Sequence, residues 1–260
     1  MRRLSENEFR IIRRFRRLYA VVAALVCLMM ISLLFLTVSN LPIFGEESNP
    51  ANNEVVERYL EKGLEETGAV NVTAGIILDY RAFDTFGEST VLFLAVAAVW
   101  MLLKKEEKEI RVLMEETLTY APKEDVIFRT VARFLTPCIL LFGIYIILNG
   151  HLSPGGGFSG GAVMGSGLIL YNLSNGTART RRFLNEKVFT RVVMGALFFY
   201  ALAKSYSFFT GGNHLESLIP LGTPGSIFSG GLILPLNIAV GLVVACTVYG
   251  IYALFARGGL

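Results

Sequence analysis

Charged residues and histidine are scarce in this sequence of 260 residues. Asp, Glu, Lys and Arg make up 17% of it, hydrophobic residues make up 53%, and there are only two histidines. A soluble domain carries a larger charged fraction, because polar side chains must cover its surface. The composition therefore excludes an ordinary soluble globular domain and indicates a protein that lies in a membrane.

Cysteine is also rare. Cys27, Cys138 and Cys246 all fall in apolar runs, and none belongs to a Cys-x-x-Cys pair. Disulfides are therefore not expected, and three thiolates are too few for an iron–sulfur cluster held by this chain alone. The histidines have no cysteine or carboxylate at metal-ligand spacing, and no serine, histidine and carboxylate combination points to a hydrolase. We expect no metal, no other cofactor and no enzymatic activity in the chain itself.

Apolar runs of about 15 to 24 residues recur along the chain and are separated by charged clusters. About 20 helical residues cross the ~30 Å of hydrocarbon in a bilayer, and the alternating segments of a membrane β-barrel are missing. The expected fold class is therefore an all-α membrane protein with about six transmembrane helices. The expected spans are residues 19–38, 89–103, 134–149, 157–173, 188–209 and 232–255.

The distribution of lysine and arginine predicts the orientation. Seven arginines precede the first span, and basic residues also follow the second and fourth spans. Because short cytoplasmic loops carry the excess of basic residues, both termini are expected in the cytoplasm. The first span is too long for a cleaved signal peptide. The basic N-terminus is interleaved with apolar side chains, which suits the inner surface of the membrane, and no nucleic-acid partner is expected.

The segment AVNVTAGIILDYRAFDTFG (69–87) is too short to be a span, because charged residues from Asp79 onward interrupt its apolar core. We expect a lateral helix near the outer surface that leads into the second span. The predicted organisation is a basic cytoplasmic N-terminus with the first span (1–40), an acidic outer loop with an amphipathic helix (41–68), the lateral helix with the second span (69–103), a cytoplasmic linker (104–127) and a four-span domain (128–260).

A glycine-rich motif occurs twice in the last four spans. SPGGGFSGGAV begins at Ser153 and TPGSIFSGGLI begins at Thr223, and a His-Leu pair precedes each copy. Both copies lie where an outward-running helix is expected to turn back, so the four spans are expected to form two helical hairpins as an internal repeat, related by an axis along the membrane normal. The proline can begin the returning helix, and the glycines allow close packing. The residues expected in this structural loop are Pro154, Gly155, Gly156, Gly157, Phe158, Gly160, Gly161, Pro224, Gly225, Gly230 and Gly231.

The motif is not expected to bind phosphate, because no Lys-Ser/Thr pair ends it and no strand precedes it. In the first copy, Gly157, Gly161 and Gly165 follow one another at four-residue steps. This spacing places them on one face of the fourth span and favours contact with another helix.

Charged residues near the expected spans are the candidate ion-pathway residues, because an unpaired charge is costly to bury in a membrane. Arg81, Asp84 and Glu88 are three and four residues apart, so on a helix they share one face, with Asp79 to the side. Two interpretations stay open for this group. It is either a salt-bridge network that fixes the helix at the surface or a hydrated acidic entrance for Na+ or H+.

Lys204 and the two histidines complete the candidates. Lys204 lies near the outer end of the fifth span. If its helix faces lipid, the side chain can extend to the surface; if its helix faces protein, a buried lysine can release and regain a proton, as a relay requires. His151 and His214 titrate near neutral pH when unperturbed and could accept protons at the outer mouth, although a loop histidine is more often simply solvated.

Two stretches carry a family resemblance. EETGAVNVTAGIILDYRAFDTFGESTVLF (65–93) resembles the E subunit of membrane-bound hydrogenases and the matching C-terminal part of the large A subunit of Mrp-type multisubunit cation/proton antiporters. GHLSPGGGFSGGAV, with the four spans around it, resembles the B subunit of Mrp antiporters and its hydrogenase counterpart, the F subunit. These regions are usually separate polypeptides, whereas here residues 104–124 join them, which suggests a fusion of neighbouring subunits.

The resemblance implies a non-catalytic membrane subunit of a Na+/H+ antiporter module that contributes to the ion pathway and to subunit packing. By position it points to Asp79, Arg81, Asp84, Glu88 and Lys204. The implied partners are other membrane subunits of the module, the lipid bilayer, Na+ and H+, and, in the hydrogenase case, a ferredoxin-linked arm. The implied location is the inner membrane of a prokaryotic cell. A purely structural scaffold in a hydrogenase-like complex and a small transporter that works alone stay open as alternatives.

Overall fold

The computed structural model describes residues 6–46, 49–117, 126–215 and 217–257, and these residues form helices and connecting turns. The chain divides into two compact units, Met1–Val56 and Glu57–Leu260. The first unit contains α1 (Glu6–Ser39), whose apolar part, Phe15–Ser39, buries none of its side chains within the chain. A helix of this length with an exposed apolar surface is typical of a single membrane span.

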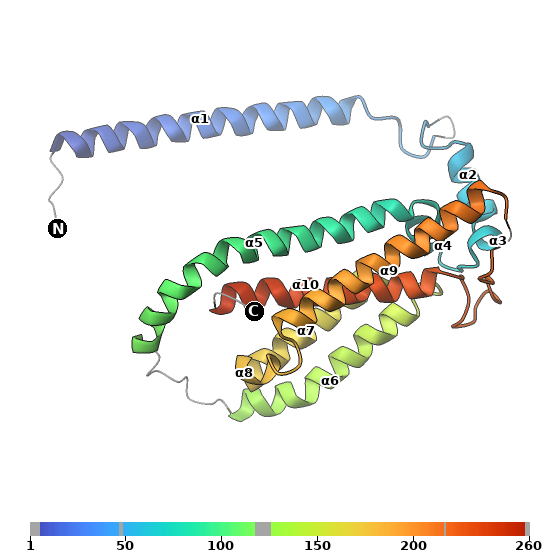
Figure 1. Cartoon of the computed structure of the whole chain (residues 1–260). Helices are drawn as coiled ribbons and strands as arrows, with labels where there is room; N and C mark the ends of the chain where they lie inside the picture. The colour runs from blue at the N-terminus through green and yellow to red at the C-terminus, as the bar shows by residue number, and fades with distance from the viewer. Residues whose placement is uncertain (1–5, 47–48, 118–125, 216, 258–260) are drawn as a thin grey trace. The chain divides into compact units, whose positions relative to one another are not determined.

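The second unit is a bundle of five long helices. They are α5 (Ala82–Thr117), α6 (Val126–Leu148), α7 (Gly157–Asn175), α9 (Glu186–Gly212) and α10 (Ile233–Arg257). The shorter elements are α2 (Glu54–Glu61), α3 (Gly63–Thr67), α4 (Val72–Gly75), a π-helix η1 (Ile76–Tyr80) and α8 (Thr177–Thr180). Figure 1 shows that α3, α4 and the α9–α10 connection gather at one end of this bundle.

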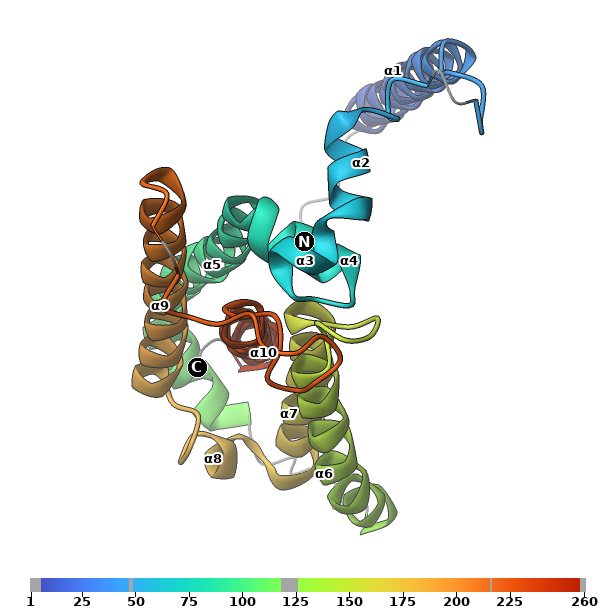
Figure 2. The ribbon, with the colours of Figure 1, turned by 90° about the vertical axis from the view of Figure 1, so that its right-hand side faces the viewer.

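Helix α10 is the centre of the bundle, with the other long helices around it (Figure 2). Its most apolar window is 67% buried, whereas the corresponding windows of α5, α6 and α9 are at most 28% buried. The two larger core clusters both use α10: Leu236 and Val240 pack with Tyr200, and Val243 packs with Phe189. The outer helices therefore present most of their apolar surface to the surroundings, as expected in a bilayer or against other membrane subunits.

The prediction of an all-α membrane protein is confirmed, but the number of spans differs. Among the described residues, five helices are long and apolar enough to cross a membrane: those at 15–39, 82–102, 126–148, 186–212 and 233–256. The sixth expected span, 157–173, is the helix α7 but is not one of them, because glycine and polar residues make up much of its sequence. Residues 104–117 of the expected linker continue α5, and residues 118–125 lie outside the described part.

The glycines of α7 lie on two contact faces. A methyl group added at Gly157 or Gly161 would lie within 2.7 Å of a carbonyl oxygen of α10, that of Asn237 or Gly241. One added at Gly160 would lie 2.8 Å from the Gly143 oxygen of α6. The face predicted at four-residue steps is thus confirmed as the contact with α10, and α6 packs against a second glycine face.

The two copies of the glycine motif, both expected where a helix turns back, have different backbone structures. In the first copy, Gly160 and Gly161 lie inside α7. In the second copy, Gly230 and Gly231 precede α10 and have left-handed φ angles of 78° and 52°. Glycine is used in the first copy because it has no side chain and in the second because it tolerates positive φ.

Neither proline begins a helix, which corrects a second expectation. Pro154 is three residues before the start of α7 at Gly157, and Pro224 is nine residues before the start of α10 at Ile233. Both prolines lie instead in the connecting turns. The two copies are therefore similar in sequence and both lie between two long helices. They differ in where the second of these helices starts.

The expected lateral helix is broken into short pieces. Asn71 caps α4, its side-chain oxygen accepting from the Ala74 amide, and the chain then widens into the π-helix η1. Arg81 leaves helical geometry at φ −116° and ψ 33°, and α5 begins at Ala82. The second span therefore starts seven residues earlier than the expected 89, and Asp84 and Glu88 lie in the first turns of the long helix α5.

Candidate ion site

Lys204 of α9 is buried and bound to a carboxylate. Its side chain is 4% exposed, and its Nζ atom lies 2.6 Å from Oδ1 of Asp79 in the π-helix η1. The helix face that carries Lys204 therefore packs against protein, and the alternative in which the side chain extends to the lipid surface is wrong. Asp79, which the helical-face analysis placed to the side of Arg81, Asp84 and Glu88, is the partner of the buried lysine.

The π-helix positions Asp79. A wide turn leaves backbone carbonyl groups without regular partners, and side chains or water must satisfy them. Tyr200 donates a hydrogen bond of 2.8 Å to the Ala82 carbonyl, and Thr85 donates one of 2.6 Å to the Ile77 carbonyl. Tyr200 lies four residues before Lys204 and so projects from the same face of α9. Two side chains on one face of α9 thus bind this region: Tyr200 binds the backbone just after η1, and Lys204 binds the Asp79 carboxylate within η1.

A polar pocket adjoins the Asp79–Lys204 pair. It has a volume of about 310 Å³ and is lined by Asp79, by Glu66 of α3, by Ser207 and Thr210 of α9, and by the segment between α9 and α10. Asp79 is 38% exposed, so its carboxylate contacts the buried ammonium group and also faces the pocket. Two carboxylates and four hydroxyl groups, those of Thr67, Ser207, Thr210 and Ser217, line one hollow and favour water and hydrated cations over an apolar ligand.

Glu66 is held on the far side of the pocket by α2 and η1. Arg58 binds it with two hydrogen bonds, of 2.9 Å and 3.3 Å, and the Tyr80 hydroxyl donates to it as well. Hydrogen bonds from Arg58 first, and then from Tyr80, lower the pKa of the Glu66 carboxyl. Burial first, and then the hydrogen bond to Glu66, raise the pKa of Tyr80 to about 12. Glu66 is therefore ionised and Tyr80 is neutral near pH 7.

Arg81 and Asp84 form a surface ion pair. The guanidinium donates to Asp84 Oδ2 over 2.7 Å, and the two side chains are 63% and 56% exposed. Such pairs contribute little to stability. Glu88 is also exposed and lies on the same helix. Neither Asp84 nor Glu88 lines the pocket at Asp79, so the acidic group predicted as one cluster is divided between the molecular surface and the Lys204 site.

His151 is completely buried, so the expectation of a solvated loop histidine is wrong for it. Its carbonyl accepts from the Asn71 amide at 3.0 Å, and its Nε2 atom lies 3.4 Å from the Ser226 carbonyl oxygen. The Asn71 side chain also donates to the Gly150 and Ser153 carbonyls. These contacts join the first glycine loop both to the start of α4 and to the segment between α9 and α10, other residues of which line the pocket.

The other loop residues are placed by backbone geometry. Gly156 has a φ angle of 126°, and the amide of the next residue, Gly157, donates to the side-chain oxygen of Asn237 in α10 at 2.9 Å. Phe158 packs against the core cluster that includes Tyr200. Pro224, Gly225 and His214 are exposed. Of the loop residues named from the sequence, Gly230 and Gly231 line the pocket and the others do not.

Sequence reasoning missed Glu66, Tyr200, Ser207 and Thr210. Along the sequence, Glu66 is one of several glutamates in an acidic amphipathic segment, and Ser207 and Thr210 lie in a largely apolar span. The one available signal is helical spacing: Ser207 lies three residues after Lys204, and a hydroxyl one turn from a buried charge indicates a polar face.

Comparisons with known proteins assign both halves of the chain. Residues 127–250 match the family described as "Domain related to MnhB subunit of Na+/H+ antiporter", and residues 12–111 match the family of the MBH E subunit. An uncharacterized protein of Methanocaldococcus jannaschii is 31% identical over 192 residues, which is 67% of this chain and 72% of that protein. A protein of Rhizobium meliloti described as the A/B subunit of a probable K+/H+ antiporter is 27% identical over 158 residues, 54% of this chain and 15% of that protein.

Two solved structures contain chains that are similar to this one. A chain of the membrane-bound sulfane sulfur reductase, an archaeal respiratory membrane complex, superposes with a TM-score of 0.71 at 33% identity, covering 90% of this chain and 97% of that one. This chain belongs to the same family as that chain, and its residues 127–250 form an MnhB-related domain. A chain of the Mrp complex from Dietzia sp. has the same fold, with a TM-score of 0.62 at 22% identity. The match covers all of this chain and 27% of that one. Single chains that carry both regions therefore occur elsewhere.

Proposed function

We propose that this protein is a non-catalytic membrane subunit of a cation/proton antiporter-like module, and that the Asp79–Lys204 pair with its pocket lines part of the ion route. The supporting observation is the pair itself: a lysine that is 4% exposed is bound to a carboxylate that faces a polar pocket of about 310 Å³. Charges at membrane depth are usually paired and mark pathways for ions or protons.

The pair suits proton-coupled exchange for a chemical reason. Among the residues that the structure describes, Asp79 is bound to Lys204 and also faces the pocket, so a cation that arrives through the pocket competes with Lys204 for the carboxylate. A cation on Asp79 leaves the buried ammonium group of Lys204 without its counter-ion, an arrangement that is costly in a membrane. Binding of a cation at Asp79 and the pairing of Lys204 are thus coupled through one short contact of 2.6 Å.

The protein is proposed to act only with partners. The solved relatives are chains of the sulfane sulfur reductase and Mrp complexes, and the outer faces of α5, α6 and α9 are largely unburied within this chain. The 33% identity to a chain of a respiratory complex supports a parent complex with a redox-driven arm, and the arginine distribution supports a plasma-membrane location with both termini in the cytoplasm. Na+ and H+ are the proposed ions.

Exchange in vesicles that contain the whole complex tests this function. D79N and K204Q each remove one charge of the buried pair, and R81Q/D84N removes the exposed pair as the matched control. We expect Na+-dependent dissipation of an imposed pH gradient to fall at least severalfold in D79N and K204Q, and to change little in the control, while native gels show intact complex. Unchanged exchange in both D79N and K204Q would refute the proposal.

A structural scaffold is the second candidate, and the glycine contacts favour it. Gly157, Gly160 and Gly161 let α7 approach α10 and α6 so closely that no side chain fits between them. If scaffolding is the whole function, G161L will dissociate the complex, whereas D79N and K204Q will leave exchange at the wild-type rate. The two candidates therefore give opposite results for the charge variants.

A further inference from the structure

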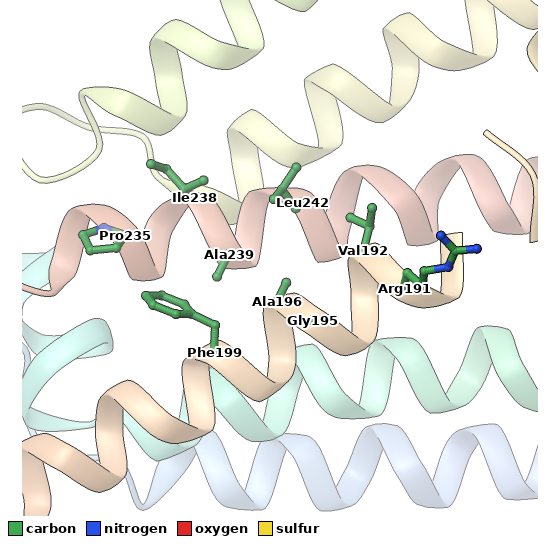
Figure 3. Close-up of a pocket in the computed structure, with 9 residues that line it drawn as sticks. All are labelled: Arg191, Val192, Gly195, Ala196, Phe199, Pro235, Ile238, Ala239 and Leu242. Carbon is green, nitrogen blue, oxygen red and sulfur yellow. The ribbon is translucent and has the colours of Figure 1, made fainter. Parts of the chain in front are cut away.

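A second hollow lies away from the ion site, between α9 and α10 (Figure 3). Its volume is about 450 Å³, which is within the range of small-molecule sites. Apart from Arg191, all the residues that line it are apolar, among them Phe199, Pro235 and Leu242. None of its lining residues belongs to the polar pocket at Asp79. The ion route proposed above leaves this groove unexplained.

Small residues create the groove. Gly195 and Ala196 of α9 and Ala239 of α10 line it, and the two alanines are part of one buried cluster. A methyl group added at Gly195 would meet no atom within 4 Å, so the space beside this glycine is open. Phe199 and Ile238, which are 42% and 37% exposed, are larger side chains that also line it. The groove is therefore a narrow apolar slot along the contact of two membrane helices.

Arg191 gives the slot a single charged end. It lies in the second turn of α9, four residues after Lys187, and is exposed. In the part of the chain that the structure describes, no carboxylate lies within salt-bridge distance of it. A guanidinium group forms paired hydrogen bonds with phosphate more readily than a lysine does. This end of α9 also follows the arginines at 179, 181 and 182, which the charge distribution assigns to the cytoplasmic surface.

We propose that the groove binds one acyl chain of an anionic phospholipid, with the lipid phosphate on Arg191. The ligand is identified by charge complementarity: it must be a long apolar chain with one anionic group at its end. The cytoplasmic leaflet supplies such lipids. The bound lipid completes the surface of the α9–α10 contact, so it is a structural lipid of this protein.

A helix from a neighbouring protein of the complex fits the groove less well. A helix with side chains is about 10–12 Å wide, whereas α9 and α10 pack together through one buried cluster that includes Ala196 and Ala239. Closely packed membrane helices meet through small residues at their surfaces, but the larger, partly exposed side chains of Phe199 and Ile238 also line this groove. A helix would also need a carboxylate of its own to neutralise Arg191.

Lipid titration of the purified complex tests this proposal. Delipidated complex in mild detergent is titrated with phosphatidylglycerol or phosphatidylcholine, and native mass spectra of the released chain count the bound lipid. We expect one phosphatidylglycerol to bind in preference to phosphatidylcholine. R191Q should weaken phosphatidylglycerol binding about tenfold, the order expected for loss of a charge-assisted contact. G195F should fill the slot and weaken binding of both lipids.

K187Q is the matched control, because Lys187 is also exposed and basic, lies one turn away and does not line the groove. It should bind phosphatidylglycerol within about twofold of the wild type. Wild-type binding in both R191Q and G195F would overturn the proposal. Release of a neighbouring protein of the complex by G195F, with lipid binding unchanged, would also overturn it and assign the groove to a partner helix.

Discussion

Asp79 and Lys204 are 125 residues apart in the sequence, and their charged atoms lie 2.6 Å apart in the structure. The two partners are buried to different extents: the lysine side chain is 4% exposed and the aspartate side chain 38%. The two side chains therefore depend on each other to different extents. The lysine depends on the aspartate for compensation of its charge, whereas the aspartate also has access to the polar pocket.

The asymmetry predicts unequal effects on stability. D79N leaves an ammonium group buried without a counter-ion and should lower the free energy of unfolding by about 1–3 kcal/mol, less than the ~3–5 kcal/mol of a fully buried pair. K204M should lower the free energy of unfolding by less than D79N does, because methionine fills similar space and the partly exposed Asp79 can be hydrated. Thermal unfolding in detergent, followed by the fluorescence of Trp100, measures both. A larger loss in K204M than in D79N would contradict the burial argument.

The double variant D79N/K204M completes the thermodynamic cycle. Because replacing a buried pair by neutral groups is often close to neutral in free energy, the double variant should be no less stable than D79N alone. Additive losses would show that the two side chains do not interact in the folded protein.

Close packing predicts that Gly161 tolerates no side chain. G161A places a methyl group 2.7 Å from the Gly241 oxygen, so α7 and α10 must separate, and we expect a loss of about 1–3 kcal/mol. G195A is the control, since its methyl group meets no atom within 4 Å and alanine favours helix; it should be neutral or stabilising by up to about 1 kcal/mol. Equal melting temperatures for G161A and the wild type would contradict the contact.

The two copies of the glycine motif should respond oppositely to asparagine. Gly230 has a φ angle of 78°, a conformation that asparagine adopts more easily than alanine, so G230N should be less destabilising than G230A. Gly160 is helical and a methyl group there would lie 2.8 Å from the Gly143 oxygen, so the larger G160N should be worse than G160A. Melting temperatures of the four variants give the comparison. If alanine and asparagine ranked in the same order at both positions, the left-handed conformation of Gly230 and the close helix contact of Gly160 would be contradicted.

The contact of Glu66 with Arg58 and Tyr80 predicts a pH dependence. The folded protein lowers the pKa of Glu66 below its usual value of 4.5, so the folded state binds this proton less readily than the unfolded state. The stabilisation is present above pH 4.5 and is lost as the pH falls through the lowered pKa. The melting-temperature difference between the wild type and E66Q should therefore be constant near neutral pH and shrink below pH 4.5. A melting-temperature difference that grows below pH 4.5 would contradict a lowered pKa of Glu66 in the folded protein.

Local features of the sequence were sufficient to predict the helices and one packing face. The spans follow from the length and apolarity of continuous segments, and the Gly157, Gly161 and Gly165 face follows from helical spacing. These properties depend on neighbouring residues only. The α7 helix has the predicted position but not the apolarity of a span, because glycine packing takes the place of apolar side chains within it.

The Asp79–Lys204 site depends on tertiary contacts and was predicted only in part. Helical spacing grouped Arg81 with Asp84 and Glu88, but the π-helix and the break at Arg81 turn Asp79 toward α9 instead. Whether Lys204 faces lipid or protein follows from the packing of α9 on η1, which no local pattern specifies. The burial of His151 likewise depends on contacts with distant segments, those of Asn71 and Ser226.

The most direct test of the central claim combines pocket access with exchange. In a complex whose chain lacks Cys27, Cys138 and Cys246, S207C places a thiol in the pocket, and F208C places one on the neighbouring exposed surface. Exchange is measured in vesicles before and after treatment with a positively charged thiol reagent, and the extent of labelling is measured by mass spectrometry. We predict that labelled S207C loses most of its exchange while labelled F208C retains it. Undiminished exchange in fully labelled S207C would contradict an ion route through this pocket.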